Sequence, residues 1–73
     1  MNVNPRTVEY NSTEKLVYMV AFIDRITSLP TKSDDLPDLK RGYDFEVGSI
    51  IIETSTFKAY MCNGDGTWTA KGA

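Results

Sequence analysis

A single thiol, Cys62, is the side chain best suited to covalent chemistry in this 73-residue chain. A cysteine nucleophile needs a neighbouring base, which is most often a histidine, and the chain contains no histidine. Cys62 flanks a cluster of turn residues and has no base beside it in the sequence. We therefore expect a buried cysteine that behaves as a small apolar residue, and a protein that is not an enzyme.

Two groups of oxygen-bearing side chains have the chemistry of calcium ligands. Asp34, Asp35 and Asp38 lie close together in sequence, and residues 63–66 read Asn-Gly-Asp-Gly. Calcium takes about six to eight oxygen ligands, and residues 63–66 lack the alternating ligands and the terminal glutamate of a calcium loop. One cysteine and no histidine leave few ligands for zinc. The sequence predicts no metal and no cofactor.

Charge and hydropathy argue against nucleic-acid and membrane partners. The net charge is -2, acidic and basic residues are interspersed, and Lys40-Arg41 is too short to form a basic patch. The longest apolar run, residues 16–23, falls well short of the roughly 20 residues that span a bilayer. The first residues show no pattern of a secretory signal. These features predict a soluble protein that is made in the cytoplasm and binds other proteins.

The length of the chain limits it to one domain with a thin core. A domain of this size buries only roughly 60% of the surface that its unfolded chain exposes. Small scaffolds usually add disulfides, a metal or a partner subunit, and one cysteine cannot form an internal disulfide. We expect the missing stability to come from oligomerisation or from docking onto a larger body.

Turn-forming residues divide the chain into an N-terminal arm, residues 1–14, and one small β-rich domain, residues 15–73. Pro5 blocks regular structure near the start of the arm. Residues 7–10 alternate polar and apolar as in a short strand, and residues 11–13 supply a turn or a helix cap. The predicted fold is mainly β: a small antiparallel β-meander or sandwich-like domain with the arm and a long Leu-Pro connector.

Residues 15–27 hold a continuous apolar run that fits either a buried strand or a buried helix. Helical spacing would place Leu16, Val20 and Ile23 on one face, whereas the β-branched and aromatic content favours a strand. We favour the strand and leave the helix open. As a strand its two faces are Leu16, Tyr18, Val20 and Phe22 on one side and Val17, Met19, Ala21 and Ile23 on the other. Both faces are apolar and need to be covered.

A long connector, residues 28–42, follows this run, and a meander over residues 48–68 ends the domain. Leucines precede prolines at positions 30 and 37, which favours extended geometry and lets the leucines pin the connector onto an apolar surface. In the second meander strand, predicted for residues 57–62, Lys58 marks the more hydrated face. A glycine-rich turn then leads to Trp68, which either closes the core or anchors an interface.

Four short segments resemble, in their order and spacing, small virion proteins of tailed bacteriophages. They read Ile26-Thr-Ser-Leu-Pro-Thr31, Gly48-Ser-Ile-Ile-Ile-Glu-Thr-Ser-Thr56, Ala59-Tyr-Met61 and Asn63-Gly-Asp-Gly-Thr-Trp68. Glutamate stands at Glu53 where such proteins usually have aspartate. The resemblance implies a head decoration, head-fibre or related accessory protein that works through a surface fit and not through an active site.

The resemblance implies a decoration protein on the capsid surface of the virion, which binds the major capsid protein, self-associates and stabilises the shell. The thin core and the apolar run agree with a protein that works in an assembly. The expected interface residues are Val8, Tyr10, Tyr18, Val20, Phe22, Leu29, Leu36 and Leu39. Two alternatives stay open: a phage protein that inhibits a bacterial enzyme in the host cytosol, and a head-fibre, neck or tail accessory protein.

Overall fold

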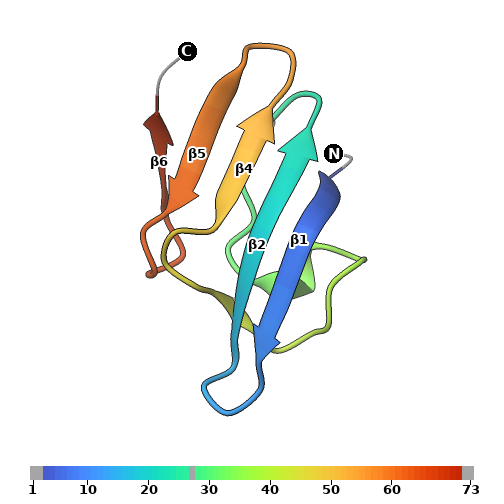
Figure 1. Cartoon of the computed structure of the whole chain (residues 1–73), viewed down its shortest axis with the longest axis vertical. Helices are drawn as coiled ribbons and strands as arrows, with labels where there is room; N and C mark the ends of the chain where they lie inside the picture. The colour runs from blue at the N-terminus through green and yellow to red at the C-terminus, as the bar shows by residue number, and fades with distance from the viewer. Residues whose placement is uncertain (1–2, 27, 72–73) are drawn as a thin grey trace.

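The computed structural model describes residues 3–26 and 28–71, which form one six-stranded mixed sheet, and the predicted mainly-β fold is confirmed. The strand order is β1-β2-β4-β5-β6, and the short β3 pairs with β2 on the same edge as β4. Figure 1 shows this sheet face on. The elements are β1 (Val3–Asn11), β2 (Leu16–Ile23), the 3-10 turn η1 (Ser33–Asp35), β3 (Asp44–Phe45), β4 (Ile50–Glu53), β5 (Lys58–Cys62) and β6 (Trp68–Lys71).

The apolar run at residues 15–27 contains a strand, β2, so the strand alternative is correct. Its side chains alternate between buried and half-buried along the whole strand, as the period of two requires. Val17, Met19 and Ala21 are fully buried, and Ile23 is nearly so. The side of the sheet that carries these residues is the core face.

The prediction of an N-terminal arm is wrong for the described part of residues 1–14. Val3–Asn11 form an edge strand, β1, which pairs antiparallel with β2 along its whole length. The register shifts between Pro5 and Thr7, so that Arg6 is an extra residue in a bulge. Proline and a bulge are both tolerated at a sheet edge, because no further strand needs the missing N–H. The segment is therefore part of the sheet.

The connector forms the second layer of the domain. Strands β2 and β4 are parallel, so the chain must cross from one end of the sheet to the other between them. Of the described residues, 24–26 and 28–43 make that crossing behind β1, β2 and β4 in Figure 1. They bury Leu36 and Leu39 against the core face, and Phe45 in β3 joins the same core. The sequence predicted the connector and its pinning leucines. It did not predict the parallel pair that makes a long connection necessary.

Ser49 completes the sheet where β3 gives way to β4. Strand β3 pairs with the first residues of β2 and β4 with the last, which leaves a gap in the ladder around Met19. The buried Ser49 hydroxyl fills this gap: it accepts the backbone N–H of Met19 at 3.1 Å and donates to the carbonyl of Val17 at 3.4 Å. A side chain thus takes the place of a backbone partner in the middle of the sheet.

The antiparallel meander β4-β5-β6 is present as predicted, with two corrections. Phe57, predicted in a strand, lies in the preceding turn with a positive φ of 58°. The more hydrated face is not the one with Lys58, since that face also carries the buried Cys62, while Met61 on the other face is 39% exposed. Lys58 tolerates this less hydrated face because it pairs across the strands with Glu53. After the hydrogen bonds from Thr56 and Ile26, the positive charge of Lys58 also lowers the pKa of Glu53.

Trp68 closes the far end of the core, which is one of the two roles left open by the sequence. Its ring meets that of Phe45 edge to face, with 5.5 Å between centroids, and its indole N–H donates to the carbonyl of Pro30 at 2.7 Å. The contact ties β6 to the connector.

Candidate functional site

The side of the sheet opposite the core face is apolar and is not covered by a second layer. In Figure 1 it faces the viewer, and none of the described segments crosses in front of the strands. The register places its apolar side chains on three adjacent strands, since Val20 and Phe22 pair with Ile50 and Ile52. We call this surface the outer face; its apolar members are Leu16, Tyr18, Val20, Phe22, Ile50, Ile52, Ala59 and Met61. Met61 is exposed and the other seven are half-buried.

Polar side chains border the outer face on both edge strands. On β1, Asn4, Thr7 and Glu9 pair with Phe22, Val20 and Tyr18, so they share the face with these residues. On β6, Thr69 and Lys71 pair with Met61 and Ala59. An apolar centre with a polar rim is the usual organisation of a protein–protein interface.

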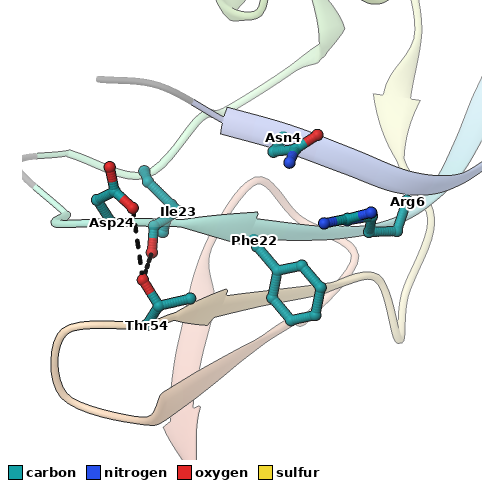
Figure 2. Close-up of a pocket in the computed structure, with 6 residues that line it drawn as sticks. All are labelled: Asn4, Arg6, Phe22, Ile23, Asp24 and Thr54. Carbon is teal, nitrogen blue, oxygen red and sulfur yellow. Dashed lines mark hydrogen bonds between the residues drawn. The ribbon is translucent and has the colours of Figure 1, made fainter.

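The β1 end of the outer face contains a shallow pocket of about 320 Å³. Figure 2 shows Arg6 and Phe22 on one of its sides, with the guanidinium carbon 5.3 Å from the centre of the ring. The opposite side is formed by Asp24 and Thr54, and the Thr54 hydroxyl lies 3.4 Å from the carbonyl oxygen of Ile23. With a cation and a carboxylate in one pocket, the site has the polarity of a protein contact and no excess charge for an anion or a metal.

Two large apolar side chains protrude elsewhere. Phe57 is 81% exposed in the turn between β4 and β5, and Val47 is 64% exposed just before β4. A non-glycine residue with positive φ is strained, so Phe57 is both strained and exposed. The sequence did not reveal the exposure of Phe57, because the alternation of residues 57–62 predicts a regular strand that begins at this residue.

The expected interface residues separate into three groups. Tyr18, Val20 and Phe22 lie on the outer face, and their role in an interface stays a prediction. Val8, Tyr10 and Leu29 are partly buried against the core. Leu36 and Leu39 are 4% and 7% exposed within the core, so their assignment to an interface is wrong. The sequence indicates that these leucines pin the connector onto an apolar surface, but it does not show that this surface is the core face of the same chain and not a partner.

Ile50, Ile52 and Met61 belong to the candidate surface and were not predicted for it. Their alternation with Ile51 and Cys62, both buried, is the signal that identifies their face. That signal becomes informative only once the parallel pairing of β2 with β4 fixes which face is the core.

The carboxylates considered as metal ligands have structural partners. Asp35 accepts the backbone N–H groups of Thr31 and Lys32, and these hydrogen bonds lower its pKa. Asp34 accepts the N–H of Gly42 at 2.6 Å. Within residues 3–26 and 28–71 there is no group of three or more potential metal-ligating side chains.

Asp65 and Cys62 are also accounted for by local structure. Hydrogen bonds from the side chain and the backbone of Thr67 lower the pKa of Asp65, which is the arrangement of an Asx turn. Cys62 is 1% exposed, and desolvation raises the pKa of its thiol. A buried thiol with a raised pKa is a poor nucleophile.

Comparison of the chain with protein-family models, with curated proteins and with solved structures gives no significant match. In the part of the chain that the structure describes, no helix is long and apolar enough to cross a membrane.

Proposed function

We propose that this chain is a non-enzymatic accessory protein of a tailed-phage virion, which binds the assembled capsid shell and stabilises it. The observation that carries the proposal is the outer face, a sheet surface with an apolar centre, a polar rim and no second layer. The resemblance of residues 26–68 to small virion proteins supports the assignment to a capsid.

The outer face leaves apolar side chains from three strands partly in contact with water. Burial of apolar surface is favourable by about 25 cal/mol per Å², so an assembly that covers this face gains stability from it. A thin domain with one uncovered sheet face therefore fits a protein whose working state is a complex.

The proposed mechanism is a linkage effect. A protein that binds the assembled shell, and not the separate subunits of the major capsid protein, shifts the equilibrium towards assembly. The protruding side chains of Phe57 and Val47 are suited to insert into hollows between shell subunits. Of the two, the aromatic ring of Phe57 is expected to contribute more binding energy, because a large side chain that fills a desolvated pocket carries much of the energy of an interface.

The experiment uses phage particles purified from a lysate in which the gene is expressed. We expect mass spectrometry to find the chain in intact virions at a fixed ratio to the major capsid protein. Purified chain added to shells that lack it is expected to co-sediment saturably and to raise their melting temperature.

Absence of the chain from virions, together with no binding to isolated shells, would contradict the proposal. Recovery of the chain in the soluble fraction, bound to one bacterial enzyme, would support the inhibitor alternative.

A further inference from the structure

The outer face has the form of a surface that fits a second copy of itself. We propose that two copies pack with their outer faces together around a two-fold axis. The axis lies between the two sheets and runs perpendicular to the strands, at the level of Thr7 and Val20. This inference names a second copy as the partner of the outer face, so that contact with the capsid shell is made by the protruding Phe57 and Val47. It rests on the proposed function in taking the outer face as buried in the working assembly.

The pattern of side chains about that level is self-complementary. The backbone pairing places Thr7, Val20, Ile50, Met61 and Thr69 in one row across the sheet. A two-fold axis along this row brings each of these residues near its own equivalent in the other copy. The row is apolar at its centre and ends in a threonine on each edge, so no charge meets a like charge on the axis.

The residues on either side of the row come in matching types. Phe22 and Tyr18 lie two residues to each side of Val20 on the same face. The two-fold axis places Phe22 of one copy over Tyr18 of the other, and the reverse, so the interface has two aromatic pairs.

The charged residues of β1 are also complementary about the two-fold axis. Arg6 and Glu9 lie on opposite sides of Thr7 along β1, and the Arg6 side chain extends over Phe22 on the outer face. The axis therefore brings Arg6 of each copy towards Glu9 of the other. Two such ion pairs at the rim fix the register of the two copies.

The available area agrees with a specific dimer. The Cα trace extends 35 Å by 21 Å across the view of Figure 1, so its outline encloses at most about 740 Å² per copy. A contact over this whole outline would bury about 1,500 Å² in the two copies together, within the roughly 1,200–2,000 Å² of specific protein interfaces. Stacked sheets lie about 10 Å apart, which two layers of half-buried side chains fill.

The test measures the mass of the purified full chain by analytical ultracentrifugation over a series of concentrations. We expect a monomer–dimer equilibrium between 8.2 kDa and twice that mass. Val20→Lys places a charge on the axis and is expected to weaken the dimer by about a hundredfold or more. Circular dichroism of this variant confirms that it is folded.

A charge-exchange series tests the register without disturbing the apolar centre. Arg6→Glu and Glu9→Arg are each expected to weaken the dimer by about tenfold, and the double variant is expected to recover the affinity. Arg41→Glu and Asp38→Arg make the same changes of charge at exposed positions in the connector, which lies behind the sheet, so they are expected to leave the dimer unchanged.

A folded chain that stays monomeric at the highest concentrations overturns the inference, as does a dimer that is insensitive to Val20→Lys and to the charge exchange. A monomer that is nevertheless present in virions overturns the dimer and leaves the proposed function standing. A dimer that is sensitive to these variants but absent from virions supports the dimer and contradicts the proposed function.

Discussion

The carboxylate of Glu53 accepts a hydrogen bond from the backbone N–H of Ile26 at 2.7 Å. Its second oxygen accepts the hydroxyl of Thr56 at 2.6 Å, so one side chain joins the end of β4 both to the start of the connector and to the hairpin turn. These two hydrogen bonds, that of Thr56 first, hold the pKa of Glu53 below its ordinary value of 4.5. The charged form of Glu53 therefore stabilises the closure of the second layer over the core.

The lowered pKa of Glu53 determines how its contribution to the stability of the fold depends on pH. Because the pKa of Glu53 is lower in the folded state, its contribution is present above about pH 4.5 and is lost as the pH falls through the folded-state pKa. We expect Glu53→Gln to be less stable than the parent at pH 7 and to lose less stability between pH 5 and about pH 3. Urea unfolding at several pH values measures the difference.

Asp35 and Asp65 also have lowered pKa values. The parent and Glu53→Gln therefore share the part of the acid sensitivity that comes from these two carboxylates. Glu14→Gln, at an exposed turn position, is the matched control and should follow the parent. Parallel pH curves for Glu53→Gln and the parent would show that Glu53 does not act through its charge.

Ser49 offers a test of the gap in the central ladder. Ser49→Ala removes the acceptor of the buried Met19 N–H and leaves that group without a partner. We expect a loss of about 1–3 kcal/mol in the free energy of unfolding, measured by urea unfolding at pH 7. Ser55→Ala, in the exposed turn after β4, should be close to neutral. An equal effect of the two substitutions would rule out a special role for the buried hydroxyl.

Local patterns favour a strand at β2 without excluding a helix, and they predict the meander and the pinning leucines of the connector. In each case the information lies in a short stretch: β-branched residues in β2, turn residues around residues 63–66, and leucines before prolines in the connector. Burial of Cys62 is expected because an unpaired cysteine usually behaves as a small apolar residue, and it is confirmed.

The features that the sequence did not reveal depend on pairs that are distant in the chain. The alternation at residues 7–10 indicates only a short strand, and the full β1 (Val3–Asn11) is recognisable only through its pairing with β2. The outer face is recognisable only through the parallel pairing of β2 with β4. The same holds for Glu53, whose acceptor role requires Ile26, 27 residues earlier in the chain. Periodicity gives the two faces of a strand but not which of them is covered.

Trp68 tests whether the contact between β6 and the connector stabilises the fold. Trp68→Phe keeps an aromatic ring against Phe45 and removes the donor to the carbonyl of Pro30, a buried residue. We expect a loss of about 1–2 kcal/mol in the free energy of unfolding, followed by circular dichroism because the variant has no tryptophan fluorescence. Thr69→Ser, at an exposed position on the same strand, keeps the hydroxyl that donates to Asn63 and is the comparison. Equal stability of Trp68→Phe and the parent would contradict a structural role for the indole N–H.

Phe57 separates the stability of the isolated chain from its binding. The residue has a positive φ of 58° and an 81% exposed ring, so its strain is not offset by burial in the free protein. Asparagine tolerates this backbone conformation, which costs most other residues about 1–2 kcal/mol. We therefore expect Phe57→Asn to be at least as stable as the parent in urea unfolding.

The same substitution is expected to weaken co-sedimentation with capsid shells by about thirtyfold, the effect of losing one aromatic anchor. Phe57→Tyr keeps the ring and the strain, and it should retain both the binding and the stability of the parent. A Phe57→Asn variant that binds shells as tightly as the parent would remove Phe57 from the proposed contact. If the variant instead loses stability, the ring has a structural contact in the free chain, and its strain is not evidence of a binding role.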